Sequence, residues 1–77
     1  MNVEWVKPSD LVPYEKNAKL HPDDQVEHIA NSIKMFGWTQ PIVVDEHNVV
    51  VIGHGRLAAA KKLMLDTVPV VRRDDLT

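Results

Sequence analysis

The feature that most constrains the fold is a short apolar run that turns through glycine into a run of helix-forming residues. Residues 49–52 are apolar and β-branched, and residues 57–64 are rich in Leu, Ala and Lys. A strand that turns into a helix leaves the first N–H groups of that helix without an acceptor. Those donors and the helix dipole favour an anion. The corner Gly53-His54-Gly55-Arg56 therefore predicts a phosphate site, in which the guanidinium of Arg56 supplies a planar fork of donors.

A packing role for the same corner is the alternative, because short glycine turns before helices are common. No Gly-Lys-Ser/Thr follows, which excludes a P-loop NTPase, and the third glycine of the dinucleotide fingerprint is absent. His54 has two interpretations. It either donates to phosphate and moves a proton, which makes it the candidate catalytic residue, or it caps the helix.

The distribution of charge agrees with an anion site in the second half of the chain. The 77 residues carry 9 Lys and Arg against 11 Asp and Glu, a net charge of −2. Residues 1–48 hold four basic and eight acidic side chains, whereas residues 49–77 hold five basic and three acidic ones. The acidic total argues against a strong independent grip on DNA.

Periodicity and breakers predict one helix in the first half of the chain. Residues 3–6 favour a strand, residues 11–14 an extended piece and residues 16–21 a loop. Pro22 suits the first turn of a helix, which Gly37 ends. Residues at i, i+3, i+4 and i+7 give this helix a buried stripe: Val26, Ile29, Ala30 and Ile33.

The second half predicts a hairpin, a helix and a strand. Residues 42–44 and 49–52 form an antiparallel pair around a turn at residues 45–48. A helix follows with an apolar stripe of Leu57, Ala60 and Met64, and residues 67–71 form the last strand. Pro69 indicates an edge strand or a bulge. The fold class is α+β, a single small domain over residues 1–77 with two main helices and short strands.

Two further side chains are candidates for the ligand site. Asn17 lies in the predicted loop as a polar contact or an ordinary turn former. Gln40 either reads a base edge or a ribose, or is an ordinary linker residue. No metal site is expected, because the chain has no cysteine and its four histidines lack ligand spacing. No stretch approaches the ~20 apolar residues that cross a bilayer, so we expect a cytoplasmic protein with no membrane partner.

Several segments together resemble the N-terminal domain of ParB and sulfiredoxin proteins, also called the ParB-like nuclease domain. They occur in the family's order from about Trp5 to Val71. The matching segments are Leu11-Val12-Pro13-Tyr14 with Asn17, Ile29 to Ile33 with Phe36-Gly37-Trp38, Gln40 to Val44, Val51 to Arg56 with Ala58-Ala59-Ala60, and Val68-Pro69-Val70.

The resemblance implies a nucleotide-using fold in which the glycine–arginine turn contacts phosphates. Partition proteins of this superfamily hydrolyse CTP, sulfiredoxins use ATP, a related group phosphorylates serine, and others are described as nucleases. The cysteine that sulfiredoxins need is absent. Where partition proteins carry Gly-Glu-Arg-Arg, this chain has Gly53-His54-Gly55-Arg56, which resembles most the ParB-like domain preceding phage and prophage DNA modification methyltransferases.

The sequence therefore predicts a ParB-like nucleotide- or phosphate-binding domain associated with DNA partitioning or modification, as part of a longer protein. A nucleoside triphosphate with Mg²⁺ is the expected ligand, DNA is expected as a partner through the full-length protein, and a homodimer is possible. Enzymatic activity, as an NTPase or a nuclease, stays open. The alternatives are a DNA-binding or nuclease domain and a non-catalytic docking or dimerisation module. The predicted site consists of Gly53, His54, Gly55, Arg56, Gln40 and Asn17.

Overall fold

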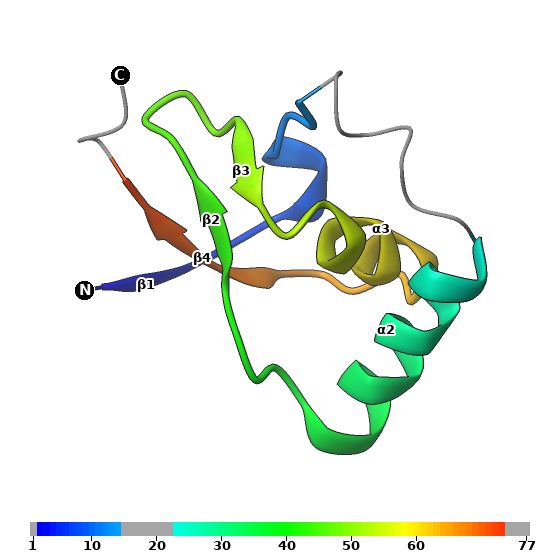
Figure 1. The fold of residues 1–77 in the computed structure, drawn as a ribbon. Coiled ribbons are helices and arrows are strands. Elements are labelled where there is room, and N and C mark those ends of the chain that lie inside the picture. Colours follow the sequence, from blue (N-terminus) through cyan, green and yellow to red (C-terminus); the bar gives the residue numbers. More distant parts are fainter. Residues whose placement is uncertain (1, 15–22, 74–77) are drawn as a thin grey trace.

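The fold is a mixed four-stranded sheet with one helix packed on one of its faces. A second helix packs against that helix. The computed structural model describes residues 2–14 and 23–73. The strand order is β1-β4-β2-β3, α3 packs against the sheet, and α2 packs against α3 (Figure 1). This arrangement confirms the predicted α+β class. The elements are β1 (Val3–Val6), the 3₁₀ helix η1 (Pro8–Asp10), α2 (Asp23–Phe36), β2 (Ile42–Val44), β3 (Val50–Ile52), α3 (His54–Lys62) and β4 (Val68–Arg72).

The predicted hairpin is present, and its turn is closed by a side chain. β2 and β3 pair antiparallel. In the turn between them, the carboxylate Oδ1 of Asp45 accepts hydrogen bonds from the backbone N–H groups of His47 at 2.8 Å and Val49 at 3.0 Å. Asn48 adopts a positive φ of 66°, which asparagine tolerates better than most residues. The predicted loop at residues 16–21, together with Pro22, lies outside the described residues.

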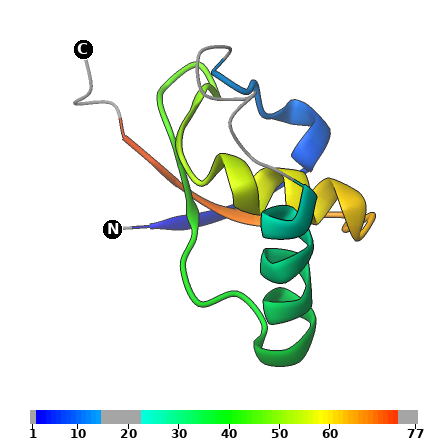
Figure 2. The same ribbon diagram turned by 45° about the vertical axis from the view of Figure 1, so that its right-hand side comes forward.

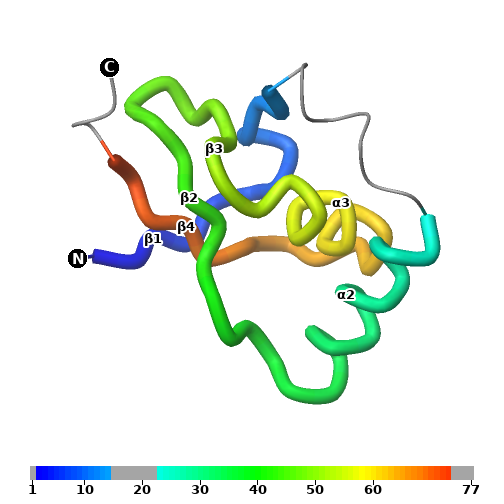
Figure 3. Tube along the Cα trace, viewed as in Figure 1, coloured from blue at the N-terminus to red at the C-terminus, as the bar shows by residue number. Residues whose placement is uncertain are grey.

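The last strand lies inside the sheet, so the expectation of an edge strand or bulge at Pro69 is wrong. β4 pairs antiparallel with β1 and parallel with β2 (Figure 3). Pro69 lies opposite Trp5 of β1, but the ladder to β2 starts only at Val70. The proline therefore occupies a position where β4 is paired on one side, and its missing N–H interrupts no pair of the β2 ladder.

The main core lies between the sheet and α3. It contains inward-facing residues of β2, β3 and β4 with Leu57 and Ala60 of α3, and Trp38 packs against it. A second cluster joins Val26 and Ala30 of α2 to Ala59 of α3. The sheet, α3 and α2 follow one another across Figure 1, and in Figure 2 α2 comes forward in front of α3. Met64 was expected in the helical stripe, but it lies beyond the end of α3, with φ at 57° and its side chain exposed.

The turn from β3 into α3 depends on Gly53. Its φ of 105° and ψ of 27° lie in the left-handed region, and it is the N-cap of α3. A Cβ atom at this position would lie 3.3 Å from Cγ1 of Ile42 and 3.4 Å from its Cα atom. Both the dihedral angle and the close approach of β2 therefore favour glycine here.

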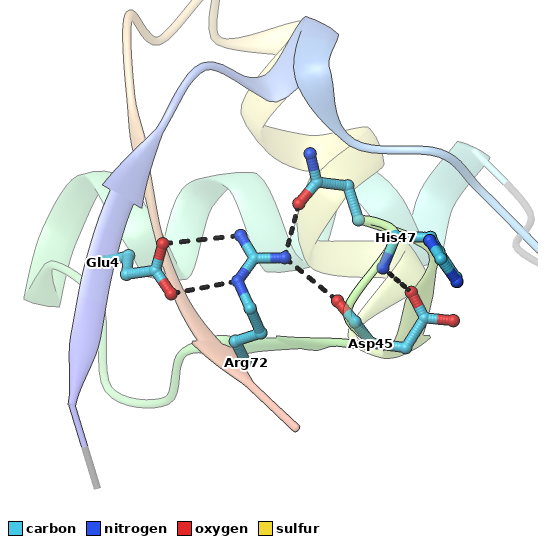
Figure 4. Close-up of polar contacts among 5 residues, drawn as sticks. Glu4, Asp45, His47 and Arg72 are labelled. Carbon is cyan, nitrogen blue, oxygen red and sulfur yellow. Dashed lines mark hydrogen bonds and ion pairs between the residues drawn. The ribbon is translucent and has the colours of Figure 1, made fainter. Parts of the chain in front are cut away.

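The guanidinium of Arg72 joins three parts of the sheet. The guanidinium of Arg72 donates from Nε to Glu4 of β1 at 3.1 Å. Its Nη1 donates to the backbone oxygen of Asp45 at 3.0 Å and to the side-chain oxygen of Asn48 at 2.7 Å (Figure 4). These bonds tie β1, β4 and the β2–β3 turn together.

We predict that the Asp45 carboxylate makes stability depend on acid pH. Its pKa is lowered from 3.8, first by the hydrogen bond from the Val49 N–H and then by that from His47, with attraction to the charges of His47 and Arg72, against an opposing effect of desolvation. A carboxylate whose pKa is lower in the folded state stabilises the fold above its unfolded pKa and loses that contribution as pH falls through the folded value. Urea unfolding from neutral pH to below 3.8 should show the wild type approaching Asp45→Asn in stability. A difference that stays constant with pH contradicts this role, and Asp66→Asn at an exposed site outside the turn is the control.

We predict that Gly53→Ala lowers the free energy of unfolding by roughly 1–2 kcal/mol, the cost of the left-handed conformation, and by more if Ile42 has to move. Gly37→Ala is the matched control, since Gly37 has a φ of 75° with nothing within 4 Å of the added Cβ. Denaturant unfolding should therefore place Gly53→Ala below Gly37→Ala in stability. Equal losses in the two variants would show that the contact with Ile42 is unimportant.

Candidate functional site

Arg56 and Gln40 meet in a groove at the beginning of α3. Arg56 lies in the first turn of the helix, and its Nη2 donates a hydrogen bond of 2.6 Å to Oε1 of Gln40, in the segment between α2 and β2. The groove has a volume of about 170 Å³. Its other wall is α2. The lining residues are His28, Ile29, Ser32, Ile33, Gly37, Trp38, Thr39, Gln40 and Arg56.

The charged guanidinium of Arg56 is hydrogen-bonded to a neutral side chain, the amide of Gln40. Within residues 2–14 and 23–73, the ion pairs join other groups, and no carboxylate lies within ion-pair distance of this guanidinium. A guanidinium carries five N–H donors, so one bond to an amide oxygen leaves most of them directed elsewhere. Among the described residues, the groove thus contains a positive charge that no carboxylate neutralises.

The two glycines of the corner, Gly53 and Gly55, shape the start of the helix. Gly55 is buried in the first turn of α3. Leu57 donates its N–H to the carbonyl oxygen of Gly53 at 2.9 Å, which starts the intrahelical ladder. The N–H groups of Gly55 and Arg56 precede this bond, and they lie at the positive end of the helix dipole.

His54 lies in a different groove from Arg56. Its Nε2 accepts a hydrogen bond of 3.2 Å from the backbone N–H of Tyr14, so the neutral ring carries its proton on Nδ1. This second groove, of about 350 Å³, lies where the beginning of α2 meets α3. It is lined by Pro13, Asp23, Val26, His54, Leu57, Ala58, Lys61 and Lys62.

The predicted site residues are therefore only partly brought together. Gln40 and Arg56 share one groove, and His54 lines the neighbouring groove. Gly53 and Gly55 lie at the start of α3, beside Arg56 in the chain, but are not among the residues that line its groove. Asn17 lies outside the described residues.

Sequence reasoning missed two polar residues of the Arg56 groove. His28 and Ser32 lie four residues apart on α2 and line the groove opposite Arg56. Their spacing parallels that of the apolar residues Ile29 and Ile33, shifted by one position, which places a polar stripe beside the apolar one. In the described part of the chain, no group of three or more His, Cys, Asp or Glu side chains forms a metal site.

Comparison with solved structures defines the class of fold. A sulfiredoxin from Arabidopsis thaliana superposes with a TM-score of 0.83 at 20% identity, over 95% of this chain and 85% of that one. The chromosome-partitioning protein ParB from Caulobacter crescentus, solved with CTP-γ-S, also gives a TM-score of 0.83, at 27% identity over 99% of this chain. The fold is therefore that of the ParB and sulfiredoxin domains.

The chain belongs to the ParB N-terminal domain family, whose model matches residues 1–77. The ParB-like nuclease domain-containing protein YnaK of Escherichia coli strain K12 is 46% identical over 68 residues, which are 88% of this chain and 78% of YnaK. In contrast, this chain spans only 47% of the Caulobacter chain. Among the described residues, no helix is long and apolar enough to span a bilayer.

Proposed function

We propose that this domain binds a nucleotide, with the phosphates at the beginning of α3 and Arg56 on the phosphate oxygens. The observation that carries the proposal is the Arg56 guanidinium, positioned by neutral Gln40 in a groove beside the first turn of α3. The Caulobacter relative, which was solved with CTP-γ-S, supports a nucleotide as the anion. Charged bidentate bonds from arginine and backbone N–H groups at a helix start are both suited to phosphate.

Each residue of the groove has a role in this proposal. Gln40 holds the guanidinium at the start of α3, while Ser32 and His28 supply donors from α2 to the same phosphates. Asn17 remains a candidate contact. Mg²⁺ would enter with the nucleotide, because phosphate oxygens and water are its usual ligands in such sites.

The domain would act on DNA through a longer protein rather than alone. The net charge of −2 disfavours independent binding to a duplex. Membership of the ParB family favours a role in partitioning, and the link to DNA modification methyltransferases remains a prediction from the Gly53–Arg56 sequence. A cytoplasmic location is part of this proposal, because nucleotide and DNA are both available there.

Turnover of the nucleotide is a separate question from binding. His54 lines the neighbouring groove, so a proton-transfer role requires a ligand that extends around the start of α3. Release of inorganic phosphate from CTP or ATP with Mg²⁺, and its loss in His54→Ala, would support such a role. Cleavage of DNA without nucleotide would instead favour the nuclease alternative.

We predict that Arg56→Ala weakens nucleotide binding by about 10- to 100-fold, since a hydrogen bond to a charged group is worth roughly 1.5–3 kcal/mol. Isothermal titration with CTP, ATP and GTP in the presence of Mg²⁺ measures the effect. Lys34→Ala is the control, because it removes one positive charge from an exposed position at the end of α2.

Absence of heat with all three nucleotides would overturn the proposal, as would equal affinities for wild type and Arg56→Ala. DNA binding that falls steeply with salt, without nucleotide, would point to the DNA-binding alternative.

We predict that Gln40→Glu weakens nucleotide binding more than Gln40→Ala. The introduced carboxylate would lie at the position that now accepts from Arg56 at 2.6 Å, and it would neutralise the guanidinium and repel phosphate. Alanine removes only the positioning bond. Titration of both variants with the same nucleotide tests this order, and the reverse order would show that Gln40 has another role.

A further inference from the structure

The sheet has a second face that neither helix covers. Cross-strand partners point to the same face, and the pairs Val3 with Val71, Val71 with Val43, and Val43 with Ile52 form one row across all four strands. Trp5 and Pro69 form a second pair on this face. Although Val71 is buried, it belongs to neither hydrophobic cluster that includes a helix. We call this the open face: Val3, Trp5, Val43, Ile52, Pro69 and Val71.

The two edges of the sheet differ in how they are covered. Beside β3, the extended segment at Val12 donates its N–H to Asn48 and accepts from Val50, both at 2.8 Å. Beside β1, in the part of the chain that the structure describes, no segment pairs with the outer side of the strand. The outward backbone groups of β1 are therefore available to another strand.

β1 has two features that limit edge pairing, its length of four residues and the charge of Glu4, but it lacks two others. It contains neither proline nor lysine, and its open-face side chains are large and exposed, at 50% for Val3 and 60% for Trp5. Its single charge, Glu4, points to the other face and is held by Arg72 through Nε at 3.1 Å and Nη2 at 3.4 Å (Figure 4).

We propose that two copies of this chain pair through antiparallel β1 strands and form a continuous sheet of eight strands. A two-fold axis at Glu4 places Val3 of each copy opposite Trp5 of the other, and pairs of aromatic and β-branched residues are favourable across strands. The same axis brings the two Glu4 carboxylates together, and each is already paired with the Arg72 guanidinium of its own copy. Across the centre the charges run Arg72, Glu4, Glu4, Arg72, so the two guanidinium groups offset part of the repulsion between the facing carboxylates and the pairing is weak.

The size of this interface determines its strength. Strands of four residues bury much less than the ~800 Å² per partner of a standard stable complex. Pairing is therefore reversible and depends on protein concentration. It does not rest on nucleotide binding, because β1 lines neither the Arg56 groove nor the His54 groove.

Sedimentation equilibrium of the 77-residue chain, from about 1 µM to about 1 mM, tests the proposal over the range of weak complexes. The expected result is a monomer–dimer equilibrium whose dissociation constant rises at least about tenfold in Trp5→Lys, because an edge lysine opposes strand pairing. Ile52→Lys is the matched control, since it adds the same charge to an exposed residue of the open face on the opposite edge strand. It should leave the equilibrium unchanged.

Three outcomes overturn the proposal: a monomer at every concentration, a dimer unaffected by Trp5→Lys, or a dimer weakened equally by both variants, which would indicate face-to-face packing of two open faces. Circular dichroism checks that each variant is folded, and Val3→Lys replaces Trp5→Lys if the latter is not. Nucleotide titration of Trp5→Lys should match the wild type, so that failure of this proposal and failure of the proposed function are distinguishable.

Discussion

The contact between Gly53 and Ile42 is the constraint on which the rest of the domain depends. β3 must end, reverse its direction and begin a helix against the strand with which it has just paired. A residue without a side chain lets the backbone pass Ile42 at this distance without displacing it. That passage sets the direction of α3. The direction of α3 in turn fixes which face of the sheet is covered, and which side chains of α2 face Arg56.

The corner from Gly53 to Arg56 contributes both to the stability of the fold and to the candidate site. Burial of Leu57 and Ala60 anchors α3 on the sheet, so the first turn of the helix is held by packing rather than by its own length of nine residues. The first-turn N–H groups and the arginine are therefore held in place by the fold, and the nucleotide binding that we propose would not have to meet the full entropic cost of ordering them.

The sequence was sufficient to predict the individual helices, strands and turns, but less so to predict which of them lie next to one another in space. The glycine turn, the stripe of α2 and the β2–β3 hairpin follow from spacing and turn chemistry, all of which are local. Pro69 was placed wrongly because strand order depends on pairing between residues far apart in the chain, here Trp5 with Pro69. For the site, the sequence indicated Arg56 and Gln40 as separate candidates but did not predict that they pair. It also did not predict that His54 lies in a different groove from Arg56. His28 and Ser32 were missed because groove walls depend on how α2 crosses α3, which periodicity alone does not specify.

The position of β4 has a consequence for how the chain acquires its structure during synthesis. The final described strand fills the space between the first strand and the hairpin, so β1 has no strand partner among the described residues until residues 68–72 have left the ribosome. Until then, a hydrophobic N-terminal strand and the inner edge of β2 are both available for mistaken pairing. Completion of the sheet must wait for the end of translation of this domain, and a chain that stops before residue 68 would lose the centre of its sheet rather than its margin.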